Sequence, residues 1–455
     1  MARNAALVPA LPDADQRLSN LLRSKGFQDW RAKVHATGGC AKPVRLAGSW
    51  AVQDAAGVRH GETEGSIFTA CGNRRASVCP SCAARYAADT FHLVRSGLTG
   101  GKGVPETVTE HVRVFATLTA PSFGAVHGRP VTRSGRVRPC SCGEWHSEHD
   151  SRLGAPVDPD GYDYVGAVLW QAHSTELWRR FTISVARTLA CALGIRPAEL
   201  KDYLRVSYAK VAEYQRRGLV HFHAVIRIDG PDGPDTMPPV AVTAELLTEA
   251  IRHAARSVEV STPDNPVTGV RVLGWGAQVD VEPIEAGGSE DPEQRVRDAR
   301  VAGYIAKYAT KDTGVTTGAD SRLRSAEHIE TLAAGEHHRQ MMRTCWRLGG
   351  VPELEGLGLR RWAHMLGFRG HFLTKSRRYS ITFGSIRQSR AEHRLSAHLA
   401  ELGIEDTDAV TVVNDWTMTG IGYHSDAERE YAAVIAETRR QRPTTRDDQQ
   451  LLDVA

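Results

Sequence analysis

The chain has 455 residues, a net charge of +4 and 41% hydrophobic residues, enough for two or three domains with real cores. It contains no apolar run of about eighteen residues and no basic-then-apolar N-terminal segment, so we expect no membrane contact and a cytoplasmic location. Acidic residues outnumber basic ones in 401–455, so residues 1–400 carry a larger positive charge than the +4 of the whole chain. A basic body of this kind suits a phosphate-rich partner.

Four cysteines in the first hundred residues have the spacing of a metal site. Cys79 and Cys82 form a short chelating turn, Cys71 precedes it, and Cys40 can supply a fourth thiolate. Thiolates at such a turn suit tetrahedral Zn²⁺, and eight cysteines in a reducing compartment favour metal over disulfides. The alternative is a set of free reduced thiols.

A second cysteine cluster lies in residues 121–165, a stretch rich in glycine, proline and charge that is typical of an insertion. Cys140, Cys142 and His146 form a candidate second zinc site. That set lacks a fourth ligand, for which His149 and Asp158 are the nearest candidates.

Residues 203–213 and 219–228 predict two strands joined by a polar turn, hence a β-hairpin. In the second strand alternate residues are apolar, so His221 and His223 share the opposite face, and Glu213 can face them from the first strand. Two imidazoles and a carboxylate leave open coordination positions, as a catalytic divalent cation requires. The alternative is three solvated side chains on a half-exposed strand.

Residues 294–312 predict a helix with two tyrosines on one face. Tyr304 and Tyr308 are four residues apart, and Lys307 and Lys311 repeat that spacing beside them. Ammonium groups favour the phenolate, and attack of a phenolate on a phosphate gives an ester that stores the bond energy for rejoining. In isolation the pattern favours an amphipathic helix with aromatic core residues and solvated lysines, and the histidine strand is what favours the catalytic interpretation.

The densest basic segment is residues 360–379, where basic and aromatic side chains are interleaved. Such a segment can hold phosphates while its rings stack on exposed bases. The alternative is a solvated surface with a few core aromatics. The candidate DNA-binding residues are Arg360, Arg361, Arg369, Lys375, Arg377 and Arg378.

These motifs resemble those of HUH-type rolling-circle replication initiators from actinomycete plasmids and integrative conjugative elements. Such initiators have an apolar strand with threonines, matched by residues 112–120, then His-hydrophobe-His, matched by His221 and His223, then Tyr-x-x-Lys, matched by Tyr308. Glu213 stands eight positions before His221, where some relatives have a further metal ligand. The resemblance covers most of residues 31–395, and relatives share the first cysteine pattern, which supports zinc.

The resemblance implies an enzyme that nicks single-stranded DNA at an origin hairpin, assisted by Mg²⁺ or Mn²⁺. Tyr308 is expected to be the main nucleophile, because Lys311 and an aspartate follow it as in relatives. Tyr304 is a second nucleophile or a positioning group, and Lys307 or Lys311 steadies the phenolate or phosphate. Attack gives a 5′-phosphotyrosine link and a 3′-hydroxyl that primes a host polymerase, and a second transesterification rejoins the strand. The chain shows no ATPase motif, so a host helicase is the expected partner.

Two alternatives stay open: an HUH relaxase or transposase with the same chemistry, and a non-catalytic, zinc-dependent DNA-binding regulator. The expected fold is α+β, with a ferredoxin-like HUH core built on an antiparallel sheet. We expect strands at 111–120, 203–213, 219–228 and 277–283, and helices at 166–193, 241–257 and 294–312. The expected segments are a peripheral N-terminus (1–30), a Cys-rich zinc module (31–107), the endonuclease domain (108–315), a helical basic DNA-binding region (316–400) and an acidic tail (401–455).

Overall fold

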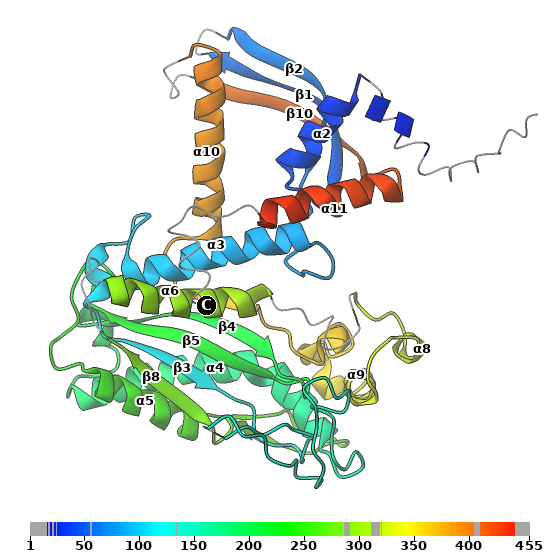
Figure 1. The fold of residues 1–455 in the computed structure, drawn as a ribbon. Coiled ribbons are helices and arrows are strands. Elements are labelled where there is room, and N and C mark those ends of the chain that lie inside the picture. Colours follow the sequence, from blue (N-terminus) through cyan, green and yellow to red (C-terminus); the bar gives the residue numbers. More distant parts are fainter. Residues whose placement is uncertain are drawn as a thin grey trace, which may run out of the picture. The chain divides into compact units, whose positions relative to one another are not determined.

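The computed structural model describes residues 16, 19–20, 22–23, 25–54, 57–132, 134–285, 292–310, 319, 321–404 and 410–441. Within 292–310, the side chains of 292–296, 306 and 308–310 fall outside this description. Contacts divide the chain into two compact units (Figure 1). Among the described residues, one unit joins those up to Asp89 to those of 383–441, and the other spans Thr90–Thr382.

The first unit is built on a three-stranded antiparallel sheet in the order β10-β1-β2. The central strand β1 pairs along its whole length with β10, from Val44 opposite Ile421 to Asp54 opposite Val410. Residues 410–441, inside the expected acidic tail, therefore form an ordered strand and helix. The unit contains β1 (Val44–Asp54), β2 (Arg59–Thr69), β10 (Val410–Ile421), α2 (Phe27–Ala36), α10 (Phe383–Glu401), α11 (Asp426–Gln441) and the start of α3 (Pro80–Thr99).

The second unit contains a five-stranded sheet in the order β8-β3-β5-β4-β9, in which every neighbouring pair is antiparallel. Its strands are β3 (Arg113–Leu118), β4 (Arg205–Tyr214), β5 (Val220–Asp229), β8 (Val279–Ile284) and β9 (Leu373–Lys375). The expected α+β class with an antiparallel sheet is confirmed, and the four expected strands are β3, β4, β5 and β8. The edge strand β9 was not expected from the sequence.

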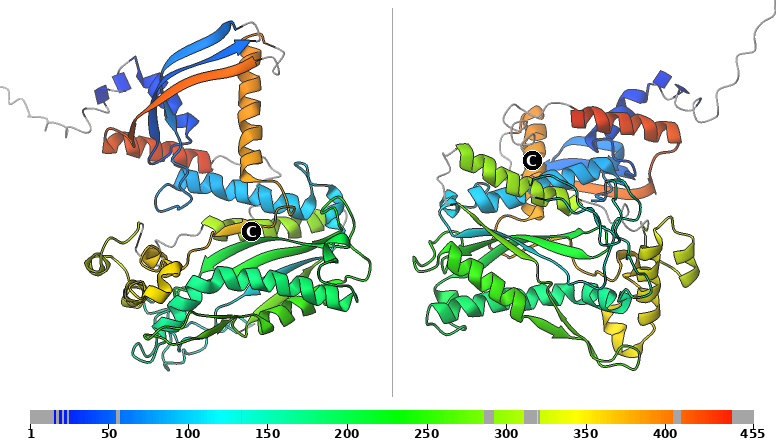
Figure 2. Two further views of the ribbon diagram at one scale, coloured as in Figure 1. Left: turned by 180° about the vertical axis from the view of Figure 1, so that it is seen from behind. Right: turned by 60° about the horizontal axis from the view of Figure 1, so that its bottom comes forward.

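The two faces of this sheet have different partners (Figures 1 and 2). Helices α4 (Tyr164–Ala192) and α5 (Ala244–Ser257) cover one face, and α6 (Pro292–Thr310) crosses the other. The α4 face holds the main hydrophobic core, in which alternate strand residues such as Leu118 and Phe222 pack on Trp170 and Phe181. The period-two pattern therefore leaves the polar residues of the same strands on the α6 side.

One charged residue departs from this pattern. Lys210 of β4 is 2% exposed and lies on the core face, with its Nζ 3.9 Å from the ring centroid of Phe222 and 5.4 Å from that of Trp178. Burial lowers the pKa of Lys210 to about 7.

The remaining elements close the ends of the second unit. They are the short hairpin β6 (Glu259–Ser261) and β7 (Val272–Gly274), helices α8 (Ala326–Glu330) and α9 (Glu336–Leu348), and the 3₁₀ turns Glu106–Thr109, Leu200–Asp202, Pro352–Leu357 and Ala363–Met365. In the described part of the chain, no helix combines the length and apolar character needed to cross a membrane.

Candidate active site

The hairpin of β4 and β5 brings Glu213, His221 and His223 together. Glu213 is directly opposite His221 in the strand register, so their side chains leave the same face. Glu213 Oε2 lies 2.6 Å from His221 Nε2 and 3.1 Å from His223 Nε2, and the two Nε2 atoms are 3.1 Å apart. Glu213 and His223 are buried, whereas His221 is half-buried at the mouth. Three ligand atoms therefore converge on one point next to the half-buried His221 ring.

The turn of this hairpin is fixed by its neighbours. Gln171 of α4 is buried, donates to the Gly218 carbonyl and accepts the Val220 N–H. Gly218 has a φ of +74°, and an added Cβ would meet Leu366 and Met341 at 2.8 and 3.0 Å. A glycine is therefore required at this turn. The rigid turn sets the register that places Glu213 opposite the histidines.

Thr117 of β3 orients the second histidine. It lies opposite His223 in the register, and its Oγ1 is 3.0 Å from His223 Nδ1. A proton on Nδ1 donates to this hydroxyl and leaves the Nε2 lone pair directed at Glu213 and His221, as in histidines that bind metals. The donor set of two imidazoles and one carboxylate fits a divalent cation. Imidazoles suit Mn²⁺ better than Mg²⁺, which prefers oxygen ligands.

Tyr304 of α6 packs against this group. Its ring centroid is 5.0 Å from that of His223 and 5.7 Å from that of Phe115, both edge-on, and it is 37% exposed. Phe115 also stacks on His223, at 5.9 Å. One of the two expected tyrosines thus lies beside the ligands with part of its ring open to solvent.

The other expected residues of the helix are described only in part. Tyr308 belongs to α6, one turn after Tyr304, but its side chain lies outside the described residues, as does all of Lys311. Lys307 is exposed in the last turn of α6. The assignment of Tyr308 as main nucleophile stays a prediction.

A buried ion pair attaches α6 to the sheet. Arg113 of β3 is 1% exposed, and its Nη1 lies 3.3 Å from Oδ2 of the fully buried Asp298 on α6. Arg113 also donates to the carbonyls of Leu98 and Glu285, at 2.6 and 2.9 Å. Burial lowers the pKa of Arg113, and the Asp298 carboxylate opposes that shift. This ion pair was not predicted from the sequence. The signal that could have indicated it is an arginine, Arg113, inside an otherwise apolar strand.

A second buried arginine closes the far end of this face. Arg227 of β5 donates to both oxygens of Asp229, at 2.6 and 3.0 Å. Asp229 also bonds His111 Nδ1 at 2.8 Å and accepts from Ser207 at 2.6 Å. Burial would raise the pKa of Asp229, but the hydrogen bonds from His111 and Arg227 outweigh it and hold that pKa below its usual value. The network therefore neutralises the Asp229 carboxylate and joins β4, through Ser207, to β5.

The four cysteines of the first unit converge. Cys40 Sγ is 3.8 Å from that of Cys79 and 3.7 Å from that of Cys82, and the sulfurs of Cys71 and Cys82 are 3.7 Å apart. Four sulfurs at about 2.3 Å from a tetrahedral Zn²⁺ are about 3.8 Å from each other, so the set fits zinc. Backbone N–H groups of Ala41 and Cys71 donate to two of the sulfurs. The Cys-rich cluster expected from the sequence is present.

The second cluster differs from the expectation in its fourth residue. Cys140, Cys142 and His146 lie together with His127, which sequence reasoning missed. The candidates considered for the fourth position were wrong: His149 is exposed outside the group, and Asp158 accepts the N–H groups of Asp160 and Gly161 in its own turn. No spacing rule pointed to His127, thirteen residues before Cys140.

The basic segment 360–379 is only partly available to a ligand. Phe368, Phe372 and Tyr379 are buried core residues, so the expected base stacking is wrong for these three rings, whereas Trp362 is half-buried. Lys375 Nζ donates to the carbonyls of Ser376, Arg377 and Ser380, and burial lowers its pKa. The exposed candidates are Arg360, Arg361, Arg369, Arg377 and Arg378.

Comparison with known proteins assigns the chain to a family. The model of the RepSA family, described as "Replication initiator protein, pSAM2", matches residues 26–437. The chain belongs to the RepSA family. A replication initiator protein of Streptomyces ambofaciens is 45% identical to it over 438 residues, which cover 92% of each chain. The match includes both cysteine clusters, the histidine hairpin and α6, and it makes the protein a replication initiator. No solved structure matches, so a ferredoxin-like HUH core is an expectation and not an observed likeness.

Proposed function

We propose that this RepSA-family initiator nicks and rejoins one DNA strand at a rolling-circle origin by tyrosine transesterification. One observation carries the proposal: Glu213, His221 and His223 converge within 3.1 Å, and Tyr304 of α6 lies against His223. A non-catalytic regulator has no need for three grouped metal-ligand atoms next to a partly exposed phenol. Membership of a replication-initiator family favours initiation over the relaxase and transposase alternatives.

The nicking step needs a tyrosine oxygen in line with the scissile phosphorus. The bond from tyrosine oxygen to phosphorus forms as the bond from phosphorus to the 3′ oxygen breaks. The phenol proton passes to solvent, and the departing 3′ oxygen takes up a proton to become the primer hydroxyl. We assign this attack to Tyr308 and a second, strand-transferring attack to Tyr304, with Lys307 and Lys311 beside the phosphate.

The other residues of the site hold this arrangement. A divalent cation on Glu213, His221 and His223 would neutralise charge on the scissile phosphate. Thr117 keeps the His223 ring in the orientation that the ligand set needs, and the Arg113–Asp298 pair holds α6 to β3. The exposed arginines of segment 360–379 supply phosphate contacts, which contribute to DNA-binding affinity but not to sequence specificity.

The test is a denaturing gel after incubation of the full chain with single-stranded origin DNA and Mn²⁺. Wild type should give a shortened DNA and a protein–DNA adduct that survives denaturation. Tyr308→Phe should abolish the adduct but retain DNA binding, and Tyr304→Phe should leave the first cleavage intact but impair rejoining. Tyr203→Phe, at an exposed tyrosine outside the site, is the matched control. An adduct formed by the double variant Tyr304→Phe and Tyr308→Phe would refute the proposal.

A further inference from the structure

The insertion between β3 and α4 has little to stabilise it apart from its polar cluster. In its described residues, 121–132 and 134–162, there is no helix and no strand, only isolated bridges between Val126 and Pro156 and between Val131 and Val137. The few buried side chains of this stretch include Cys140 and His146 themselves. A segment of this length with so small an apolar core needs a cross-link or a metal to hold one conformation.

The cluster has the geometry of a metal site. His146 Nε2 lies 3.4 Å from Cys142 Sγ and 3.2 Å from His127 Nδ1, and all four ligand atoms lie within 4.8 Å of one another. Around a tetrahedral Zn²⁺, bonds of about 2.0 Å to nitrogen and 2.3 Å to sulfur separate two nitrogens by about 3.3 Å and nitrogen from sulfur by about 3.5 Å. The measured separations match both values.

Two further contacts orient the ligands. The Asp150 carboxylate lies 2.7 Å from His146 Nδ1, so it fixes the ring with Nε2 turned toward the sulfur of Cys142. The Gly128 N–H donates to Cys140 Sγ at 3.2 Å. A carboxylate behind a histidine and an N–H donor on a thiolate are the outer contacts usual in structural zinc sites. His127 is brought in by the backbone, because its N–H and carbonyl pair with Ala155 and Gly154.

We propose that His127, Cys140, Cys142 and His146 bind one structural Zn²⁺, and that this ion holds the insertion against the turn of the histidine hairpin. The claim that the insertion is held against the turn rests on hydrogen bonds that residues of the turn donate to it. Arg216 Nη1 donates to the Glu148 carbonyl at 2.9 Å, and Arg217 donates to the carbonyls of Ala120 and Pro121. Gly154 packs so closely that a Cβ there would lie 2.5 Å from the Arg216 backbone.

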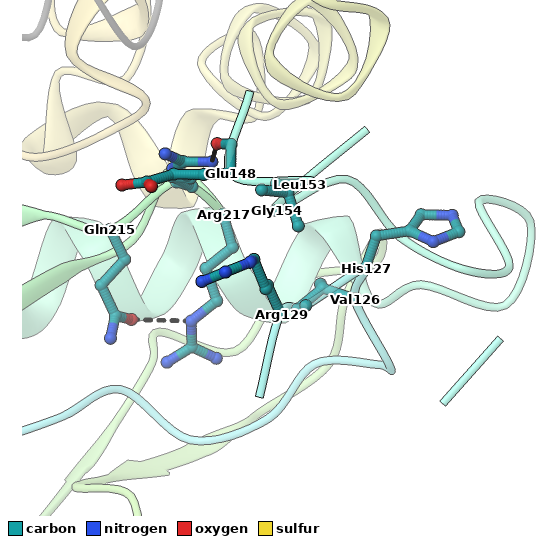
Figure 3. Close-up of a pocket in the computed structure, with 10 residues that line it drawn as sticks. Val126, His127, Arg129, Glu148, Leu153, Gly154, Gln215 and Arg217 are labelled. Atoms are coloured by element: carbon teal, nitrogen blue, oxygen red, sulfur yellow. Dashed lines mark hydrogen bonds between the residues drawn. The ribbon is translucent and has the colours of Figure 1, made fainter. Parts of the chain in front are cut away.

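The insertion and the turn line an open cavity of about 450 Å³, whose walls include Arg129, Arg216 and Arg217 (Figure 3). His127 and Arg129 come from the insertion, and Gln215 and Arg217 come from the turn (Figure 3). His127 is thus both a zinc ligand and part of the cavity wall. The metal cross-links the loop that carries Glu148 and Gly154, and these residues brace the turn between Glu213 and His221.

Zinc stoichiometry tests the binding. The metal content of the full chain, purified with zinc and freed of weakly held ions by mild chelation, is counted by native mass spectrometry. Wild type should retain two Zn²⁺, one in each cysteine cluster, and His127→Ala and Cys142→Ser should each retain one. His149→Ala, in the same loop but outside the group, should retain two. A wild type with a single zinc, or a His127→Ala variant that keeps both, would overturn the proposal.

Limited trypsin digestion tests the role of the ion and requires no activity. The exposed arginines Arg136 and Arg152, neither of which is followed by proline, offer cleavage sites in the insertion. His127→Ala should be cut there at least about tenfold faster than His149→Ala, and added Zn²⁺ should protect wild type stripped by a strong chelator but not the variant. Equal digestion rates for the two variants would show that the ion does not hold the insertion.

Discussion

Thr117 and His223 face each other across β3 and β5, with Oγ1 of the threonine 3.0 Å from Nδ1 of the histidine. The contact joins a residue from the first family motif to one from the second. For His223 to bind a cation through Nε2, its proton must be on Nδ1, so in that state Nδ1–H donates the hydrogen bond and the Thr117 hydroxyl accepts it.

Thr117→Val keeps the shape of the side chain and removes the hydroxyl. The His223 ring then loses its orienting acceptor, and we expect the Mn²⁺ concentration for half-maximal cleavage to rise about 10- to 100-fold. Thr117→Ser retains the acceptor and should stay close to wild type. Identical Mn²⁺ titrations for the valine and serine variants would show that the hydroxyl has no such role.

His221→Ala and His223→Ala should each lower cleavage by orders of magnitude, because each removes one of three ligands. Origin binding, measured by fluorescence anisotropy, should persist because basic contacts elsewhere carry it. Chelation should reproduce the defect in wild type, and Mn²⁺ should reverse it. His253→Ala, at an exposed histidine on α5, is the control. Full cleavage by the double alanine variant would mean that both histidines are merely strand surface.

Arg113→Met should destabilise the second unit by about 3–5 kcal/mol, because it leaves the Asp298 carboxylate buried without its cation. Urea unfolding followed by tryptophan fluorescence measures this loss. Arg196→Met breaks an ion pair at the surface and should leave the midpoint unchanged. Arg113→Met should also lower the cleavage rate more than it lowers the affinity for the metal, because α6 is displaced while the histidine hairpin stays intact. Equal unfolding midpoints for the two variants would contradict this account.

Lys210→Met should stabilise the second unit, and the gain should depend on pH. The folded-state pKa of Lys210 is lowered to about 7 from an ordinary value of 10.5, so protonation favours the unfolded chain. The stability that wild type has above pH 10.5 is lost as the pH falls toward 7, and the loss is complete below 7. The advantage of the methionine variant should therefore grow over that window to as much as about 5 kcal/mol. Urea midpoints at pH 6.5 and pH 9.5 measure it, and a pH-independent difference would show that Lys210 remains charged when folded.

Local patterns predicted four of the five strands of the second unit's main sheet, because apolar and polar residues alternate along them or a polar turn joins them. Alternation along β5 put His221 and His223 on one face, and the hairpin turn brought Glu213 opposite them. The position of His127 could not be predicted, because irregular backbone and not a spacing rule carries it to Cys140. The three-residue strand β9 is too short to show a period, and its aromatic neighbours proved to be core residues.

The pairing of β1 with β10 has a consequence for biosynthesis. Val44 and Ile421 are partners, so the sheet of the first unit cannot close until the chain has left the ribosome as far as residue 421. Every residue of the second unit between Thr90 and Thr382 emerges earlier and can fold first. The cysteines of the first cluster are made early, yet Gly39 beside Cys40 packs against the carbonyl of Ala432 in α11, which is made after the second unit. A nascent chain released before β10 would present β1 as an open strand edge, prone to pairing with other chains.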